Sequence, residues 1–567
     1  MHLQRARALV RYYLDRHLYD TAAFWADKAV SISRGCAEDV FTLAQSLFLA
    51  GRYRRAALLL KSKGLVQCHL ICRYLVAKCH AQCGEWKSVI DVLDILIDET
   101  DSEVTIKELS DVTNTCGIIS SGVDSAICYL RGVACQALEN RLYAKENYKQ
   151  ALRLDVFCSE AFDALMSHHL LTPQEAREFL DTLPFDSQCS DTEEQESLRF
   201  LYYSQLDVKV LAFDEASVPE SLSRSLDVKV CTAEQYYISW DHDSAVNITK
   251  QILKEDLFHP RCVLLHIGCL AALEETNEIF LLAHKLVDDC PQEAISWYAV
   301  GCYYTSCQKY DTARQFFSKA MTIDPLFGES WLAFAHAFAY EGEHDQAIAA
   351  YQTAARHMPG CHLPLLFIGQ EYVQMDNSLA GKFFKQALKI APEDPDVLHE
   401  LGVLKYQLGM YQKAEKYFSD AISHVEKYKG VGIQRHWEML YNNYGHVCRK
   451  LGKYDDAILS HHKALQLELH NPSTHSALGF VYSLTLQHRK AVEEYHKALK
   501  LKKEDTFTMQ LLNHELEVLA GFDPLQGTDL GANNPNTVEE LETKIHSNTS
   551  DMDDCAKSET LSDIEID

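Results

Sequence analysis

The sequence predicts an all-α fold in which about thirteen helix–turn–helix repeats stack into a superhelix. Two observations support this fold class. Small residues recur through the second half of the 567-residue chain at a period close to 34 residues, and alanines follow them at nearly constant distances. The composition, with 47% hydrophobic and 24% charged residues, is that of a chain that folds. We therefore expect one long repeat array.

One complete repeat lies between Ser296 and Pro325, in "SWYAVGCYYTSCQKYDTARQFFSKAMTIDP". Its tryptophan, glycine, aromatic, alanine and proline residues have the spacing of the tetratricopeptide repeat (TPR), in which helix A is followed by helix B. A small residue is needed where the two helices cross, because a larger side chain would push their axes apart. The residues expected to provide this packing are Gly301, Ala313, Ala320, Ala335, Ala347, Gly369, Gly402, Gly445 and Gly479.

Interruptions of the period divide the chain into four parts. Residues 1–184 are expected to form an N-terminal TPR array with an acidic loop at 97–124. An acidic and polar linker at 185–230 follows, and residues 231–520 are expected to form a C-terminal TPR superhelix with a peptide-binding groove. The last part, 521–567, has 12 acidic and 2 basic residues and is predicted to be a disordered acidic tail.

Charge and hydropathy limit the kinds of partner. The formal net charge is −27, whereas nucleic acids and anionic membranes attract basic surfaces, so neither is expected as a partner. The first twenty residues lack an unbroken apolar segment, and the longest apolar run is too short to span a membrane. The 19 cysteines include no Cys-x-x-Cys pair, which favours reduced, mostly buried thiols in an intracellular protein.

Motifs that would indicate chemistry are weak. Cys68 and Cys72, and likewise Cys79 and Cys83, could face a metal ion from one side of a helix, but structural zinc sites favour tighter spacing on turns, so buried thiols are the preferred interpretation. "HELGV" at His399 lacks the second histidine of a zinc protease. No phosphate-binding loop, dinucleotide-binding motif or nucleophile elbow occurs. The sequence therefore predicts no catalytic residue, no metal and no cofactor, and a protein that is not an enzyme.

The concave groove of the C-terminal repeats is the remaining candidate site. Residues one place after the small residue of helix A, or three places before it, lie on the face opposite helix B and are expected to face the groove. Their mixture of amide, imidazole and apolar groups suits a bound peptide, although some of them could simply be solvated. The candidate groove residues are Tyr298, His336, Gln370, His399, Asn442, His446 and, in the same unit as Asn442, Arg449.

Four hydroxyl residues are candidate phosphorylation sites, because each has an acidic residue three places further on, as an acid-directed kinase prefers. The alternative is an unmodified, solvated acidic segment. Phosphorylation would add negative charge to segments that are already acidic. The four candidates are Ser190 in the expected linker and Ser550, Thr560 and Ser562 in the tail.

Several stretches are more specific than a general TPR pattern. They include "FWADK" at 24–28, "GCHLPLLFIGQEY" at 360–372, "QALKIAPEDPDVLHELGV" at 386–403 and "NNYGHVCRKLGKYDDAI" at 442–458. In these stretches the chain closely resembles the cell division cycle protein 16 family, subunit 6 of the anaphase-promoting complex (the cyclosome). The resemblance runs from the N-terminus to about residue 515.

The resemblance implies a non-catalytic scaffold subunit of a multi-subunit cullin-RING ubiquitin ligase that marks mitotic cyclins and securin for the proteasome. It implies a homodimer through the N-terminal repeats, including "FWADKAV", and a groove that holds the N-terminal segment of a small chaperone-like subunit near Gln370, His399, Asn442 and His446. Neighbouring TPR subunits, and indirectly the cullin and RING chains, would be further partners. The implied location is the nucleus and cytoplasm, with association with the spindle and centrosome in mitosis.

Two other classes of protein are less consistent with the sequence. A free TPR adaptor, such as a co-chaperone that grips a C-terminal carboxylate, needs a cluster of groove cations with asparagine. Only Asn442 and Arg449 fall together in this way, so the adaptor is the weaker alternative. An enzyme with an appended repeat region has no room for a catalytic domain outside the repeats.

Overall fold

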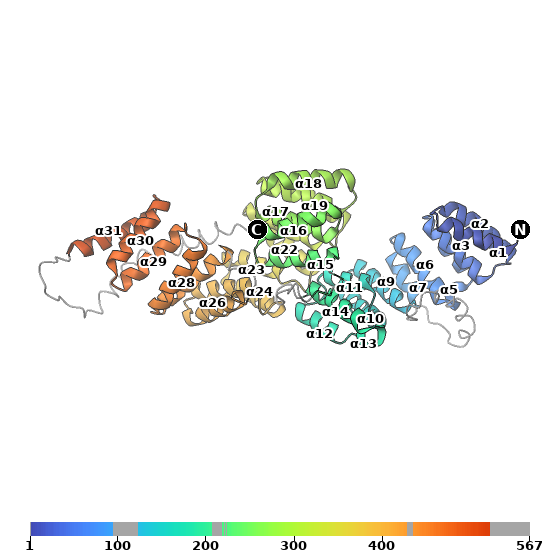
Figure 1. Cartoon of the computed structure of the whole chain (residues 1–567), viewed down its shortest axis with the longest axis horizontal. Coiled ribbons are helices and arrows are strands. Elements are labelled where there is room, and N and C mark those ends of the chain that lie inside the picture. The colour runs from blue at the N-terminus through green and yellow to red at the C-terminus, as the bar shows by residue number, and fades with distance from the viewer. Residues whose placement is uncertain are drawn as a thin grey trace. The chain divides into compact units, whose positions relative to one another are not determined.

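The regular elements in the described part of the chain are all helices (Figure 1). The computed structural model describes residues 2–94, 123–206, 218–219, 222, 224–427 and 435–521. The expected acidic loop, apart from its last two residues, and the expected tail beyond Gly521 lie outside these ranges. The chain divides into two compact units, Met1–Tyr202 and Tyr203–Asp567, and the division falls inside the segment expected to be a linker.

The first unit contains five helix pairs that follow one another along the chain. A continuous buried cluster extends from Val10 in the first helix to Ala134 in the fourth pair, so successive pairs share one core. The helices are α1 (Leu3–Leu14) with α2 (Tyr19–Ile32), α3 (Ala37–Leu49) with α4 (Tyr53–Ser62), α5 (Leu65–Cys68), α6 (Leu70–Gln82) with α7 (Trp86–Leu93), α9 (Asp124–Ala137) with α10 (Arg141–Leu154), α11 (Ser159–Ser167) with α12 (Pro173–Asp181), α13 (Phe185–Gln188) and α14 (Thr192–Leu206).

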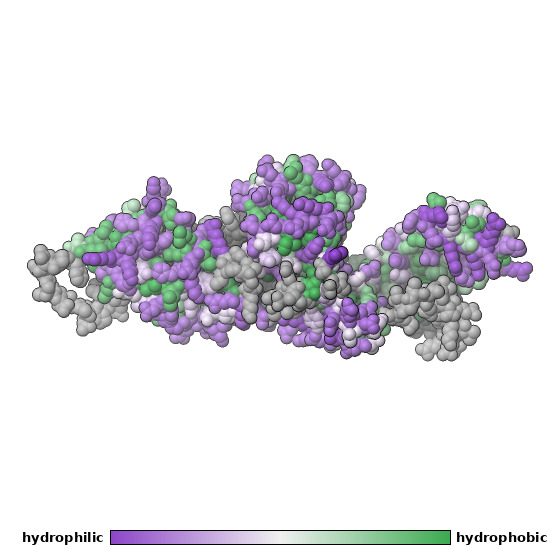
Figure 2. Space-filling model, viewed as in Figure 1, coloured by the Kyte–Doolittle hydropathy of each residue, from purple (hydrophilic) through white to green (hydrophobic). Residues whose placement is uncertain are grey.

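The second unit contains eight further pairs and a final helix. These are α15 (Leu226–Ile238) with α16 (His242–Glu255), α17 (Pro260–Ala272) with α18 (Thr276–Asp289), α19 (Ala294–Ser306) with α20 (Tyr310–Ile323), α21 (Gly328–Tyr340) with α22 (His344–His357), α23 (Leu363–Val373) with α24 (Asn377–Ile390), α25 (Pro395–Gln407) with α26 (Tyr411–Val425), α27 (Glu438–Lys450) with α28 (Tyr454–Leu467), α29 (Pro472–Leu484) with α30 (His488–Leu501), and α31 (Thr506–Gly521), with the short 3-10 helix η4 (Arg435–Trp437) before α27. The predicted all-α TPR superhelix is confirmed. Hydrophilic residues cover most of its visible face (Figure 2).

The two helices of a pair meet where a glycine of helix A faces an aromatic ring of helix B. A Cβ atom built on Gly301 would lie 2.3 Å from a ring carbon of Phe317, and one on Gly369 would lie 2.4 Å from Phe384. Such distances leave no room even for alanine with the rings in place. The same contact recurs at Gly132 with Tyr148, Gly402 with Phe418, Gly445 with His461, and Gly479 with Tyr495.

The turn between helix A and helix B has a residue in the left-handed region. Gly342 has φ of 76° and Gln308 has φ of 56°. The backbone N–H of Gly342 donates to the carbonyl of Ala339, and that of Glu343 donates to the carbonyl of Phe338, so the last carbonyls of helix A keep partners. A left-handed residue that ends helix A in this way keeps the connection to helix B three residues long.

At the turn between α15 and α16 the left-handed residue is a tryptophan. Trp240 has φ of 61°, an uncommon conformation for a large side chain. Its ring stacks on His436 of η4, with centroids 3.5 Å apart and planes 9° from parallel, and it packs against the buried cluster of α25–α28. His436 Nε2 also lies 3.5 Å from Asp396 Oδ1 of α25. Repeats normally contact only their neighbours, whereas this contact joins the first pair of the second unit to the seventh.

The segment 185–230, expected to be an acidic linker, contains α13 and α14. Tyr202 of α14 is buried, stacks on Phe162 with centroids 4.1 Å apart, and donates a hydrogen bond to the carbonyl of Val156 at 2.6 Å. These contacts attach α14 to the preceding pairs. Glu193 and Glu194 lie in the first turn of α14, where negative charge stabilises the N-terminus of a helix. The acidic composition that suggested a linker is therefore also compatible with a helix.

Replacing Gly301 with leucine is expected to lower the free energy of unfolding by about 3 kcal/mol or more, because the new side chain would displace the Phe317 ring. Thermal unfolding would measure the change. Gln315→Leu, at an exposed position on α20, is the matched control and should be nearly neutral. Equal midpoints for both variants would contradict the packing described above.

Trp240→Gly should free η4 without disturbing the α15–α16 pair, because glycine adopts the left-handed conformation readily while the stacked ring is lost. Amide hydrogen exchange should become faster in residues 435–440. Gln308→Gly relieves the same backbone conformation at another turn and should leave that segment unchanged. Unchanged amide hydrogen exchange at residues 435–440 in Trp240→Gly would show that the stacking does not stabilise η4.

Candidate functional site

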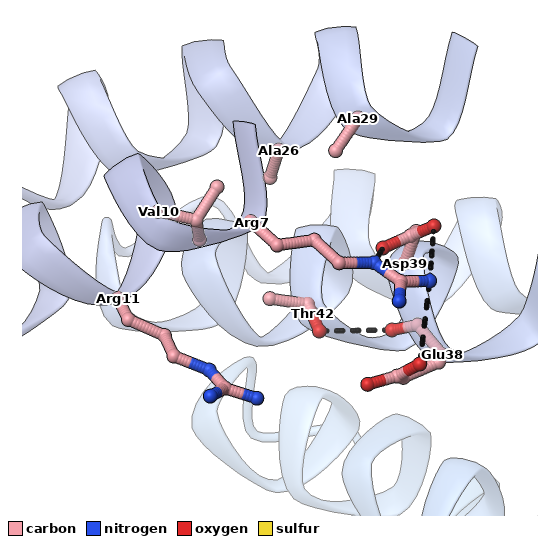
Figure 3. A pocket seen from close by; sticks show the side chains of 8 residues that line it. All are labelled: Arg7, Val10, Arg11, Ala26, Ala29, Glu38, Asp39 and Thr42. Carbon is pink, nitrogen blue, oxygen red and sulfur yellow. Dashed lines mark hydrogen bonds and ion pairs between the residues drawn. The ribbon is translucent and has the colours of Figure 1, made fainter. Parts of the chain in front are cut away.

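A small cavity in the first unit contains an ion pair (Figure 3). It has a volume of about 30 Å³ and lies between α1, α2 and α3. Arg7 Nε donates to Asp39 Oδ1 at 2.7 Å, and another guanidinium nitrogen of Arg7 lies 3.3 Å from Glu38. Burial acts to raise the pKa of Asp39, but hydrogen bonds, chiefly from Arg7, outweigh it and hold the pKa below its usual value. The ion pair already satisfies the buried carboxylate, and it joins α1 to α3, so its role is structural.

The predicted groove residues all lie on helix A of their pairs, in the second unit. Tyr298 is on α19, His336 on α21, Gln370 on α23 and His399 on α25. All four are half-buried. Asn442, His446 and Arg449 come together on α27, where Asn442 is buried and the other two are half-buried.

Around α19 and α21 the predicted residues are surrounded by aromatic rings. Tyr298 packs edge-on against Phe327, with centroids 5.3 Å apart, and burial raises its pKa. His336 Nδ1 is hydrogen-bonded to the hydroxyl of Tyr351 at 2.6 Å, and its ring packs edge-on against Phe367 at 4.6 Å. Burial lowers the pKa of His336 to about 4. Both side chains are therefore uncharged at neutral pH.

His399 joins two repeats. Asn443 Nδ2 donates to His399 Nε2 at 2.9 Å, which links α27 to α25. The other ring nitrogen, Nδ1, lies 3.4 Å from Glu400. Sequence reasoning identified His399 but missed Asn443, which is one place away from a predicted groove position. These contacts give His399 a structural role at the junction of two repeats.

The most developed cluster of polar groups lies between α27 and α29. Asn442 Oδ1 accepts a hydrogen bond from His461 Nδ1 of α28 at 2.9 Å. His446 packs edge-on against the His461 ring with centroids 5.2 Å apart, and the Arg449 guanidinium lies 4.9 Å from the centre of the Phe480 ring on α29. Burial, and then the charges of Arg449 and Lys450, lower the pKa of His446 to about 3. We call Asn442, His446, Arg449, His461 and Phe480 the α27 cluster.

His461 was not predicted, although the repeat pattern contains a signal for it. In the neighbouring repeats its position holds an aromatic ring packed on the glycine of helix A, as Phe418 and Tyr495 do. A histidine at such a position places polar atoms in the core. His461 is fully buried, and burial, with smaller effects from nearby cationic groups, lowers its pKa well below the usual value. Comparing each position across the repeats would therefore have identified it.

Only one of the four candidate phosphorylation sites lies among the described residues. Ser190 is exposed between α13 and α14, and its backbone N–H donates to Glu194 at 2.7 Å. Ser550, Thr560 and Ser562 lie outside the described residues.

Burial raises the pKa of Cys72 to about 11 and that of Cys79 to about 12. Within the described ranges, His, Cys, Asp and Glu side chains form no group of three or more that could hold a metal ion, and no helix is long and apolar enough to cross a membrane.

Acidification should destabilise the second unit, because His336 and His446 stay neutral when folded but protonate below about pH 6.5 when unfolded. The unfolded chain then binds protons that the folded chain does not. Between pH 7.5 and pH 5 each should lower the free energy of unfolding by up to about 2 kcal/mol.

Calorimetric melting at the two pH values would measure this loss. His336→Gln keeps an acceptor for the Tyr351 hydroxyl but does not titrate, so it should lose less stability than the unaltered chain. His470→Gln, at an exposed position, is the control. Identical pH dependence of His336→Gln and the unaltered chain would show that His336 does not carry the effect.

Comparison with known proteins extends over nearly the whole chain. The family described as "Anaphase-promoting complex, cyclosome, subunit 3" matches residues 15–95, and tetratricopeptide repeat families match 294–325, 395–423 and 440–473. The chain is 46% identical over 534 residues to the human "Cell division cycle protein 16 homolog", covering 92% of this chain and 85% of that protein. It is 36% identical to "Anaphase-promoting complex subunit 6" of Arabidopsis thaliana, covering 90% and 96%.

A solved structure agrees with these relatives. The "Crystal structure of APC/C hetero-tetramer Cut9-Hcn1" has a TM-score of 0.68 and 33% identity, covering 91% of this chain and 96% of that one. Identity above 30% over nine-tenths of the chain leaves no doubt about common descent. The chain therefore belongs to the cell division cycle protein 16 family, the family of anaphase-promoting complex subunit 6.

Proposed function

We propose that the protein is a non-catalytic TPR scaffold subunit of the anaphase-promoting complex, a cullin-RING ubiquitin ligase that controls mitotic progression through ubiquitination of cyclins and securin. The observation that carries this proposal is the extent of the relationship, 46% identity over 92% of the chain, which is far more than a shared repeat type would produce. The protein then acts where that complex acts, in the nucleus and cytoplasm and at the spindle and centrosome in mitosis.

The groove of the second unit holds an extended segment of a small subunit, in this proposal a counterpart of Hcn1 in the Cut9-Hcn1 structure. Support comes from the nature of the side chains at the groove positions. Tyr298, His336 and His446 present neutral polar groups in surroundings that disfavour charge. Such groups suit the backbone amides and carbonyls of a bound chain better than they suit a strongly charged ligand.

The first unit forms a homodimer in this proposal. Its outer surface carries large apolar side chains that the unit itself leaves exposed: 55% of Phe24 and 66% of Leu58, and also 47% of Tyr12. Exposed apolar side chains of this size are available for a protein–protein contact. Phe24 lies in the stretch "FWADKAV", for which the family resemblance implies a dimer contact.

A free adaptor that grips a terminal carboxylate is less well supported. Such a site needs several groove cations that are free to meet the carboxylate. Arg449 lies over Phe480, and the neighbouring His446 and His461 stay neutral at physiological pH. One positive charge, already in contact with an aromatic ring, makes a poor carboxylate clamp.

Affinity purification of the tagged, full-length protein from mitotic extract tests the proposal. Near-stoichiometric recovery of a cullin, a RING chain, other TPR subunits and a small Hcn1-like subunit is the expected result. An untagged extract is the control for non-specific capture. Recovery of chaperones alone, or of no partner, would contradict membership of the complex in cells.

A further inference from the structure

One helix pair departs from the way the others are packed. In the second unit the ring beneath the small residue of helix A belongs to a phenylalanine or tyrosine in the other pairs from α19 to α30, namely Phe317, Tyr351, Phe384, Phe418 and Tyr495. In the pair α27–α28 it is His461, whose ring lies 2.6 Å from where a Cβ of Gly445 would be. His461 is as completely buried as the other rings. A polar ring in this position needs partners for its two nitrogen atoms.

The neighbouring pairs show where the far end of such a ring lies. The hydroxyl of Tyr351 is hydrogen-bonded to His336, one residue after the small residue of helix A, and that of Tyr495 to Ser483, four residues after it. In the first unit the hydroxyl of Tyr148 likewise donates to Gln136, four residues after Gly132. The far end of the ring therefore faces the edge of helix A that carries the groove residues. On α27 the corresponding residues are His446 and Arg449.

One nitrogen of His461 has a partner and the other has none. His461 Nδ1 donates to Asn442 Oδ1 at 2.9 Å, so in the neutral ring Nε2 carries a lone pair and is an acceptor. Nε2 is buried and has no hydrogen-bond partner among the described residues. An unpaired buried acceptor costs free energy that a phenylalanine at this position would not cost. Such costs are retained mainly at functional sites.

His446 is the neighbouring imidazole placed to complete the missing bond. The centroids of the two rings are 5.2 Å apart, so a nitrogen–nitrogen distance of about 3 Å is reached when one nitrogen of each ring points at the other ring. A neutral His446 that donates to His461 Nε2 has its proton on that nitrogen. Its second nitrogen is then an acceptor directed away from His461.

We propose that, when the groove is occupied, Asn442, His461 and His446 form a one-way chain of hydrogen bonds whose open end accepts an N–H group of the bound segment. Each residue donates to the one before it, so the bond that the ligand makes at the open end must be donated by the ligand. The partner is a backbone or side-chain amide N–H of the small Hcn1-like subunit, and this part of the inference rests on the proposed function. The cluster therefore selects for a donor and against a carbonyl or carboxylate.

The test compares folding with binding in two variants. His461→Phe restores the ring found in the neighbouring repeats and removes the unpaired Nε2, but it also removes the donor to Asn442 Oδ1, so its thermal midpoint should stay close to that of the unaltered protein. Its dissociation constant for the full-length small subunit of the same organism, measured by calorimetry, should rise about tenfold, the effect of one lost hydrogen bond. His446→Phe should weaken binding to a similar degree.

A double-mutant comparison separates a chain of bonds from two independent contacts. If the two histidines act in one chain, the double variant should bind little more weakly than either single variant. Tyr495→Phe is the matched control. It removes a hydroxyl from the same position of the next repeat, and that hydroxyl is bonded to Ser483 of the same repeat. It should leave binding unchanged.

Replacement of single backbone N–H groups by N-methyl in the groove-binding segment of the small subunit identifies the donor. One position should lose affinity for the unaltered protein but not for His461→Phe. Tight binding by folded His461→Phe and His446→Phe, or strictly additive losses in the double variant, would overturn the inference while leaving the proposed function intact. Failure of the unaltered protein to bind the small subunit at all would overturn both.

Discussion

The close approach of helix A and helix B at a glycine determines how the helix pairs of this protein pack. A Cβ on Gly301 or Gly369 would collide with a ring of helix B, so these pairs can pack as they do only while the helix A residue has no side chain. Because each pair supplies the surface on which the next pair packs, the position of every groove side chain follows from these crossings. A scaffold built in this way needs no further element to align its binding surface.

The repeat period was sufficient to predict the fold, because the crossings require small residues and the sequence shows them directly. Contacts that do not recur could not be predicted in this way. The hydrogen bond between Asn443 and His399 and the stacking of Trp240 on His436 each involve residues that are unremarkable in their own repeats. The attachment of α14 to the preceding pairs could not be predicted either, because it depends on the tertiary contacts of Tyr202 with Phe162 and Val156. For the groove, helix geometry predicted Asn442 and His446 but could not show that His461 lies beneath them.

The chemistry of the predicted groove positions follows from their burial. Histidine is the residue most able to change charge near neutral pH, yet the surroundings of His336 and His446 lower their pKa to about 4 and about 3. Imidazole groups held in this way offer directional hydrogen bonds without net charge. A protein with a formal net charge of −27 therefore carries uncharged imidazole groups at two of the predicted groove positions.

The contact of Trp240 with His436 changes how the second unit responds to force. A stack of repeats that touch only their neighbours behaves as a coil spring, in which small rotations at every junction add up to a large extension. Stacking the first pair on η4, six pairs further along, closes a ring of contacts through the intervening pairs. The junctions between these pairs therefore cannot all rotate independently of one another while the two rings stay stacked.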